Sequence, residues 1–283
     1  MHDTAVFLLT HQWTESVAYR FARLWREVSP RADCFVLLHD DQGEVTQRWR
    51  AFLKSMDAEH ALSLFRPEAL AGELGFALYG SEGVLGNTHL PLASAMLRGP
   101  WRHCWQIESD VEYRGAWSEF LQAFDASKAD LLASHPFRFH DWPSWRWWTS
   151  LSVPVGKALD KRAMVKAFLP VFRISRPLLD AVLQAHREGW SGHFEVLMPT
   201  VAAVRGLVVE DLRSSHASYV GDSQDPLPIL PLLSTMRWRP EISLREFTGR
   251  ARGALLFHPV KQNWAFDADG VRRWPEPAQR PPS

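Results

Sequence analysis

The residues best placed to carry out chemistry are three acids at alternate positions near the middle of the chain. In the stretch WRHCWQIESDVEY (101–113), Glu108, Asp110 and Glu112 follow an apolar run with the composition of a strand. Alternate residues of an extended chain point to one side, where carboxylates repel one another unless a cation or hydrogen-bond donors lie between them. Oxygen ligands of this kind suit Mg²⁺ or Mn²⁺ and the substrate phosphates that such ions bind. The stretch therefore indicates a site for a metal-bound diphosphate.

A structural interpretation of the same acids stays open. Three acids after a strand also form a solvated turn, and they stabilise the positive N-terminus of a helix that begins near Gly115 or Trp117.

The elements that would position these acids alternate between strand and helix. The strand-like runs are TAVFLLTH, DCFVLLHDD, ALSLF and WRHCWQI, and the runs between them, TESVAYRFARLWREV, VTQRWRAFLKSM and GNTHLPLASAMLRG, have helical character. This order predicts an α/β fold with a Rossmann-like, mostly parallel central sheet flanked by helices. In such sheets ligands bind beyond the carboxyl ends of the strands, which is where residues 108–110 fall.

The rest of the chain predicts one large domain and a short tail. ADLLASH and KAFLPVFRIS are strand-like, RPLLDAVLQAHREG and FEVLMPTVAAVRG are helix-like, and the end of the chain, WPEPAQRPPS, is polar and rich in proline. We expect a single catalytic domain over residues 1–265 and a Pro-rich polar tail over residues 266–283.

Composition limits the possible partners and the location. Lys plus Arg and Asp plus Glu number 32 each, so no overall field attracts nucleic acid or an anionic membrane. No apolar run approaches the roughly 18–20 residues of a transmembrane span, and the N-terminus has no signal-like segment. Cys34 and Cys104 lie in apolar runs, as expected of buried thiols in a reducing compartment. We expect a soluble, cytoplasmic protein with no nucleic-acid partner.

Three local matches point to a known family. They are the N-terminal units AVFLLTH and CFVLLHDD, the stretch WQIESDVEY where the family has an Asp-x-Asp or Glu-Asp-Asp metal motif, and a later acid and histidine. With these features the chain, over about residues 4–260, resembles nucleotide-sugar glycosyltransferases of the GT-A fold. The middle position is Ser109, and the motif departs from Asp-x-Asp in having Glu108 first. The resemblance implies a nucleoside-diphosphate sugar donor, Mn²⁺ or Mg²⁺, and a glycan or other hydroxyl acceptor.

The resemblance also implies a metal shell. Asp110 would be a direct ligand, and Glu108 would contact the ribose or a metal-bound water. His258, in ALLFHPVKQNW, stands where many GT-A enzymes carry a histidine that completes the shell, and Lys261 follows close enough to contact a phosphate. Alternatively, His258 is a hydrogen-bonded structural residue and Lys261 is a solvated surface lysine.

The resemblance assigns a catalytic base as well. Inverting members of the family use an acid at a helix start, downstream of the metal motif, to take the proton from the acceptor hydroxyl. Glu195 in GWSGHFEVLMPT has that setting, and Glu210 and Asp211 are reserve candidates. The alternative is that Glu195 only stabilises the helix N-terminus.

Nucleotide and acceptor contacts are expected from strand ends and from a Trp-rich segment. Thr10, His11 and Asp40 follow the first two strand-like runs and are candidates for base and ribose contacts, although HDDQGE is also typical of a turn. The rings of the segment HDWPSWRWWTS would either line the acceptor site, with Arg146 facing an anionic group, or pack as a lid over the core. The rings assigned to the acceptor are Trp145, Trp147 and Trp148.

Two other functions stay open. Ser109 inside the metal motif is compatible with a non-catalytic nucleotide- or glycan-binding protein of the same fold. Clustered acids also occur in metal-dependent phosphoesterases, but no second dense acidic cluster is visible. Neither GxGxxG nor GxxxxGK[ST] occurs, and the histidines lack HExxH spacing, so dinucleotide, P-loop and zinc-hydrolase sites lack their motifs.

Overall fold

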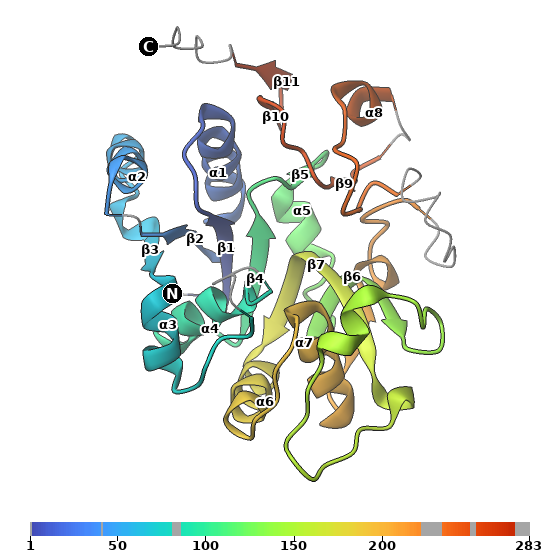
Figure 1. Ribbon diagram of the computed structural model, residues 1–283. Helices are drawn as coiled ribbons and strands as arrows, with labels where there is room; N and C mark the ends of the chain where they lie inside the picture. Colours follow the sequence, from blue (N-terminus) through green and yellow to red (C-terminus); the bar gives the residue numbers. More distant parts are fainter. Residues whose placement is uncertain (1, 41, 81–85, 222–233, 250–252, 275–283) are drawn as a thin grey trace, which may run out of the picture.

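The protein is an α/β structure (Figure 1), described by a computed structural model over residues 2–40, 42–80, 86–221, 234–249 and 253–274. The strands are β1 (Thr4–Thr10), β2 (Asp33–His39), β3 (Leu62–Phe65), β4 (His103–Glu108), β5 (Glu112–Tyr113), β6 (Leu131–Arg138), β7 (Val165–Ser175), β8 (Val209–Asp211), β9 (Leu256–Phe257), β10 (Trp264–Asp267) and β11 (Gly270–Arg273). The α-helices are α1 (Glu15–Val28), α2 (Glu44–Ser55), α3 (Pro67–Leu74), α4 (His89–Leu97), α5 (Trp117–Gln122), α6 (Arg176–Arg187), α7 (Phe194–Val204) and α8 (Leu244–Gly249).

The central sheet has seven strands in the order β3-β2-β1-β4-β7-β6-β8. Four of its pairs are parallel, and only β7 runs against its neighbours β4 and β6. The predicted fold class, a mostly parallel sheet flanked by helices, is thus confirmed. Because β7 is reversed, its amino end meets the carboxyl ends of β1 and β4 at one edge of the sheet.

Alternation along the strands gives the sheet two apolar faces. In β1, Ala5 and Phe7 pack with residues of α3, α4, α6 and α7, whereas Val6 and Leu8 pack with residues of α1, α2 and α5. Figure 1 shows α1 and α2 on one side of the sheet and α4 and α6 on the other. Because helices cover both faces of the sheet, the strands are nearly continuous apolar runs.

The C-terminal part of the chain returns to the carboxyl end of β4 (Figure 1). There β9 pairs antiparallel with β5, and α8, β9 and β10 form a small apolar cluster around Phe247 and Phe257. The antiparallel hairpin β10–β11 covers residues 264–273. The expected boundary after residue 265 falls inside this hairpin, so residues 266–273 are not a tail. Residues 275–283 lie outside the described residues, and the single-domain organisation stays a prediction.

In the part of the chain that the structure describes, no helix has the length and apolar character needed to span a bilayer. Cys34 and Cys104 are both buried and unpaired, which agrees with the expected thiols. Burial raises the pKa of both thiols above the ordinary value because it disfavours the thiolate.

Candidate active site

Two acids and a histidine converge beyond the carboxyl end of β4. Glu108 ends this strand, Asp110 lies in the turn that follows, and His258 comes directly after β9. The β5–β9 pairing and a hydrogen bond from the Val260 amide to the Asp110 carbonyl (2.7 Å) bring the two segments together. One ligand atom from each of the three side chains lies within 4.8 Å of the others. His258 Nε2 is 3.5 Å from Glu108 Oε2 and 3.4 Å from Asp110 Oδ1.

The imidazole of His258 is oriented by the backbone. Its Nδ1 lies 2.7 Å from the Arg237 carbonyl, to which it donates, and its Nε2 faces the two acids. Burial disfavours the charged ring, but the carboxylates of Asp110 and Glu108 outweigh this effect and raise the pKa of His258 to about 10. Burial also raises the pKa of Glu108, against the attraction of His258, and the neighbouring Asp110 raises it further. For Asp110 burial is overcome by His258, Lys261 and Arg20, so its pKa is lowered.

This donor set fits a divalent cation. The two carboxylates supply the hard oxygen ligands that Mn²⁺ and Mg²⁺ prefer, and the imidazole adds a nitrogen ligand, which suits a transition metal better than Mg²⁺. Donation of the Nδ1 hydrogen to a carbonyl is the outer hydrogen bond that metal-binding histidines normally make. Because an ion would displace the proton from Nε2, its apparent affinity rises with pH.

Glu112 does not belong to this cluster, contrary to the expectation that all three acids share one side. The Val111 amide donates to the Glu108 carbonyl (3.0 Å), so the chain turns between the two strands and the alternation is broken. Glu112 is 1% exposed and accepts from Arg20 Nε at 2.8 Å, with Arg23 Nη1 3.7 Å away. Burial raises its pKa against the attraction of Arg20 and Arg23. Glu112 therefore links β5 to α1 through a buried ion pair with Arg20.

Glu112→Gln should lower the free energy of unfolding by about 3–5 kcal/mol, because it leaves the Arg20 guanidinium buried without its counter-charge. Urea unfolding measures this loss, and Glu119→Gln, which alters an exposed acid on α5, is the control. Mn²⁺ affinity should stay within about twofold of wild type. Loss of Mn²⁺ binding at unchanged stability would instead make Glu112 a ligand.

Glu195 lies in the first turn of α7, close to the same edge. Its Oε1 accepts from the Leu169 amide of β7 at 3.3 Å, and its side chain is 13% exposed. Next to Leu169, the Phe168 ring packs edge-on against His258 with the ring centres 5.3 Å apart. Burial raises the pKa of Glu195 to about 7, against the attraction of Lys166 and the Leu169 amide. The charges of Glu108 and His258 also act on this pKa, so Glu195 and the metal candidates share one electrostatic environment.

The start of α7 is positioned by a glycine. Gly192 has a φ of +147°, and a Cβ at this position would lie 2.9 Å from the Ser150 carbonyl oxygen. The Ser191–Ser152 bridge and a hydrogen bond from the His193 amide to Ser150 Oγ (3.0 Å) join this turn to the Trp-rich segment. Only a glycine fits this close approach without strain.

Lys166, at the amino end of β7, lies beside Glu195 and was not predicted. The residue is 5% exposed, and its ammonium faces the rings of Phe137, Trp142 and Trp145 at 5.2, 4.7 and 5.1 Å. Burial lowers its pKa to about 8, against the attraction of Glu195. A lysine heading the apolar run KAFLPVFRIS was the signal in the sequence, because an isolated cation at a buried strand end needs an explanation.

The Trp-rich segment contributes some of its rings to the edge beside Glu195. Trp147 stacks on His193 with ring centres 4.5 Å apart, and Arg146 lies over Trp147 at 4.2 Å. Trp145 contacts Lys166, as described above. The assignment of Trp148 to the acceptor is corrected by the structure. This residue is 4% exposed and packs in an apolar cluster with Met164 and Val196, so it does not line an acceptor site.

The expected nucleotide contacts are spread along the edge. The end of β1 adjoins the metal candidates, because the Ser109 amide donates to the Leu9 carbonyl at 3.1 Å. Thr10 is 2% exposed and its hydroxyl is engaged with the Gln12 backbone, whereas His11 is exposed. Lys261 is exposed; its charge helps to lower the pKa of Asp110 and opposes the rise in the pKa of Glu108.

Asp40 lies at the end of β2, two strands away from β4. Its Oδ2 accepts from Arg66 Nε at 3.1 Å, and its Oδ1 accepts from the Gln42 amide at 3.0 Å and from the Thr46 hydroxyl at 3.3 Å. Burial opposes ionisation, but these partners lower the pKa of Asp40 overall. Oδ1 thus serves the turn before α2, which is the structural alternative, and Oδ2 pairs with Arg66, so we leave Asp40 out of the proposed site.

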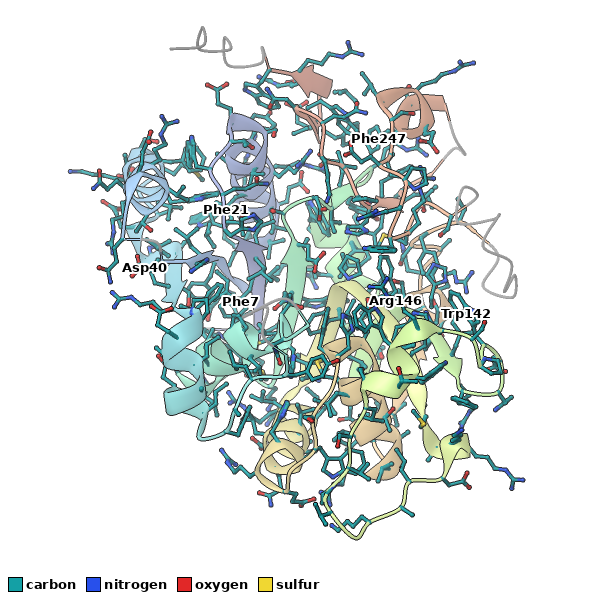
Figure 2. All side chains as sticks on the ribbon, in the orientation of Figure 1. Phe7, Phe21, Asp40, Trp142, Arg146 and Phe247 are labelled. Carbon is teal, nitrogen blue, oxygen red and sulfur yellow. The ribbon has the colours of Figure 1, made fainter. Side chains whose placement is uncertain are left out.

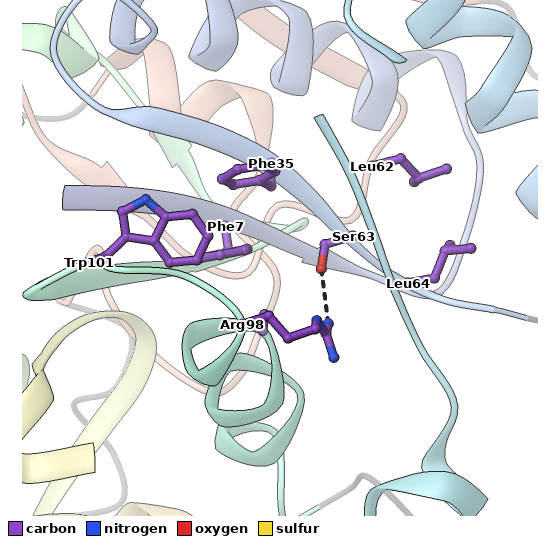
Figure 3. A pocket seen from close by; sticks show the side chains of 8 residues that line it. Phe7, Phe35, Leu62, Ser63, Leu64, Arg98 and Trp101 are labelled. Carbon is purple, nitrogen blue, oxygen red and sulfur yellow. Dashed lines mark hydrogen bonds between the residues drawn. The ribbon is translucent and has the colours of Figure 1, made fainter. Parts of the chain in front are cut away.

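Cavities elsewhere in the fold contain none of these groups. One of about 340 Å³ lies between β1, β2, β3 and α4 (Figure 3), where Phe7, Phe35 and Trp101 form an aromatic wall and Arg98 donates to Ser63. Another of about 350 Å³ lies at the amino ends of β1 and β4 and includes His103 and Arg173. Neither of these two cavities includes Glu108, Asp110, Glu195 or His258.

Comparisons with known proteins identify similar folds only. No protein-family model and no curated protein matches the chain. Among solved structures, an inositol-1-phosphate CTP transferase from T. maritima is 11% identical, with a TM-score of 0.41, over 75% of this chain and 86% of that one. The galactosyltransferase LgtC, in complex with donor and acceptor sugar analogues, is 15% identical, with a TM-score of 0.39, over 74% and 72% of the two chains. At these values the likeness carries no argument about activity.

Proposed function

We propose that this protein is a metal-dependent glycosyltransferase, which moves a sugar from a nucleoside diphosphate to a hydroxyl of a glycan or other acceptor with inversion. The observation that carries the proposal is geometric: Glu108, Asp110 and His258 converge at one edge, and Glu195 accepts from the Leu169 amide, next to the Phe168 ring that packs on His258. The pKa of Glu195, which burial raises to about 7, agrees with this placement. A general base works best when its pKa lies near the operating pH.

The residues proposed to hold Mn²⁺ or Mg²⁺ are Asp110, Glu108 and His258. A bound divalent ion would act as a Lewis acid that stabilises the charge of the departing diphosphate. Lys261 adds a positive charge beside these acids and is proposed to contact a phosphate. His11, which is exposed at the end of the adjoining strand, is proposed to contact the nucleoside; Thr10 is 2% exposed and bonded to the Gln12 backbone, so it is not.

Glu195 is proposed to accept the proton of the acceptor hydroxyl. The acceptor oxygen forms the new bond to the anomeric carbon as the bond to the diphosphate oxygen breaks, and the proton ends on a Glu195 oxygen. The Leu169 amide keeps Oε1 in place, so that the carboxylate does not have to reorganise during the reaction. Attack from the side opposite the leaving group inverts the anomeric carbon.

The two alternative functions, a phosphoesterase and a non-catalytic binding protein, each leave some of the residues described here without a role. A phosphoesterase has no need for aromatic rings beside its base, and a purely binding protein has no need for a buried acid that titrates near neutrality. The rings of Trp145 and Trp147, with their flat faces and polar edges, suit a carbohydrate acceptor. The site therefore favours glycosyl transfer over both.

The direct test incubates the full-length protein and Mn²⁺ with UDP-, GDP- and CDP-sugars and measures the nucleoside diphosphate released. We expect turnover with one nucleotide class and loss of turnover when EDTA removes the ion. Calorimetry that detects binding without turnover would favour the non-catalytic protein. Hydrolysis of a generic phosphodiester would favour the phosphoesterase, and an absence of both heat and turnover with every donor would refute the proposal.

A further inference from the structure

Three cations without acidic partners stand among the aromatic rings beside Glu195. They are Lys166, Arg146 and Arg239, and within the residues that the structure describes none of their side chains forms an ion pair or a hydrogen bond. Their charged groups lie over the faces of aromatic rings, and their more distant titratable neighbours are Glu195 and His135 for Lys166 and His193 for Arg146. In a chain with equal numbers of acidic and basic residues, such a local excess of positive charge is not a consequence of composition.

Lys166 is the buried member of this group. With 5% of the residue exposed, its ammonium has three hydrogens and no hydrogen-bond acceptor in the described structure. A buried cation without acceptors loses hydration that the faces of the three surrounding rings replace only in part. An oxygen atom of a ligand would complete its shell.

Arg146 and Arg239 form the exposed members. The Trp238 ring, which is 59% exposed, lies against both guanidinium groups, at 5.2 Å from Arg146 and 4.5 Å from Arg239. Arg146 is thereby placed between Trp238 and Trp147. Stacking on ring faces leaves the edges of a guanidinium, where its N–H groups point, open to a ligand. Figure 2 shows Arg146 and Trp142 on the same side of the molecule, far from Asp40.

Backbone and ring contacts connect this group to both halves of the proposed site. On one side, Trp238 follows Arg237, whose carbonyl accepts from His258 Nδ1. On the other side, Trp147 stacks on His193, whose Nδ1 lies 3.9 Å from Glu195 Oε2. Through these contacts the cations and rings adjoin His258 on one side and Glu195 on the other.

We infer that the acceptor is an anionic carbohydrate, carrying a carboxylate or a phosphate. This inference rests on the proposed function and specifies its acceptor. Trp142, Trp145 and Trp147 are partly exposed and Trp238 is 59% exposed, so these residues offer aromatic surface for contact with sugar rings. The unpaired ammonium and guanidinium groups offer charge-assisted hydrogen bonds to the anionic groups, and a planar guanidinium matches both carboxylate and phosphate.

The test measures binding of oligogalacturonate, a phosphorylated oligosaccharide and a neutral oligogalactose of matched length to the full-length protein by calorimetry. We expect at least one anionic ligand to bind about tenfold or more tightly than the neutral one, because a hydrogen bond to a charged group is worth roughly that factor. The ligand that binds better tells a carboxylate from a phosphate acceptor. Raising the salt concentration should weaken anionic binding and spare neutral binding.

Variants test whether these cations are responsible. Arg146→Gln and Lys166→Met should each weaken binding of the anionic ligand by about tenfold and change the neutral ligand by less than about twofold. Arg50→Gln removes an exposed charge from α2 and should change neither. Equal affinity of wild type for anionic and neutral ligands, or equal losses for both in the variants, would overturn the inference. Nucleoside-diphosphate binding with Mn²⁺, measured in parallel on wild type, tells whether the proposed function fails as well.

Discussion

Glu195→Gln should reduce the turnover number for sugar transfer by about 10²–10⁴-fold, the usual range for loss of a general base. The amide keeps an oxygen that accepts from the Leu169 amide, so the start of α7 should keep its geometry. Binding of the nucleoside diphosphate with Mn²⁺ should be preserved, because the proposed contacts of the donor lie at β1, β4 and β9. Steady-state kinetics and calorimetry on the same preparation measure the two effects.

The pH dependence of kcat/KM gives a second test of the proposed role of Glu195. Burial raises the pKa of Glu195 to about 7, and only the ionised carboxylate accepts a proton, so kcat/KM should rise with pH and level off above about 7. Glu195→Gln should lose this limb. Because the folded pKa lies above the ordinary value of 4.5, ionisation opposes folding, and wild type should lose stability relative to Glu195→Gln between pH 5 and 8.

The matched control is Glu210→Gln. Glu210 lies on β8 and accepts from the Ser127 hydroxyl at 3.2 Å, away from the metal candidates at β4. Its replacement should leave the turnover number within about twofold of wild type. A comparable loss in Glu210→Gln, with Glu195→Gln fully active, would transfer the base role to the reserve candidate.

Asp110→Asn should weaken Mn²⁺ binding by about 100-fold or more, since even loss of an outer hydrogen-bond partner of a metal ligand costs 10–100-fold. In wild type, Mn²⁺ at about 100 times its Kd stabilises the fold by about 2.7 kcal/mol, which raises the melting temperature by roughly 5–10 °C. Asp110→Asn should show almost no such rise at the same concentration. Differential scanning calorimetry with and without Mn²⁺ measures it, and transfer activity should fall in parallel.

A full Mn²⁺-induced rise in melting temperature in Asp110→Asn would contradict the assignment of this ligand. Glu112→Gln provides the contrast, because it should lower stability in the absence of the ion yet keep the Mn²⁺-induced rise. The two acids stand two residues apart in the sequence, so their different behaviour would separate a ligand from a structural ion-pair partner.

The strands and helices of the N-terminal half could be predicted because their apolar patterns are strong and local. The runs around Phe7, Val36 and Cys104 became β1, β2 and β4, and Thr14, whose side chain accepts from the Val17 amide, begins α1 as a helix-capping residue does. The reversed direction of β7 could not be predicted, because an apolar run has the same pattern whichever way it runs.

The candidate site was predictable only in part, because distant segments build it. His258 reaches Asp110 through pairing of β5 with β9, two strands of two residues each, whose sequences carry almost no pairing signal. Alternation placed Glu112 with the ligands, but the turn at Glu108–Val111 sends it to Arg20 instead. Lys166 could not be predicted, because the rings and the acid that surround it come from segments distant in the sequence.

The connection between β6 and β7, residues 139–164, separates two tasks of the molecule. It supplies Trp142, Trp145, Arg146 and Trp147, whereas Asp110 and His258 belong to other segments. Exchange of this one loop for another of different sequence would therefore change which molecules are recognised and leave the ion ligands untouched. A graft of this loop is therefore the natural route to redesigning the proposed acceptor preference.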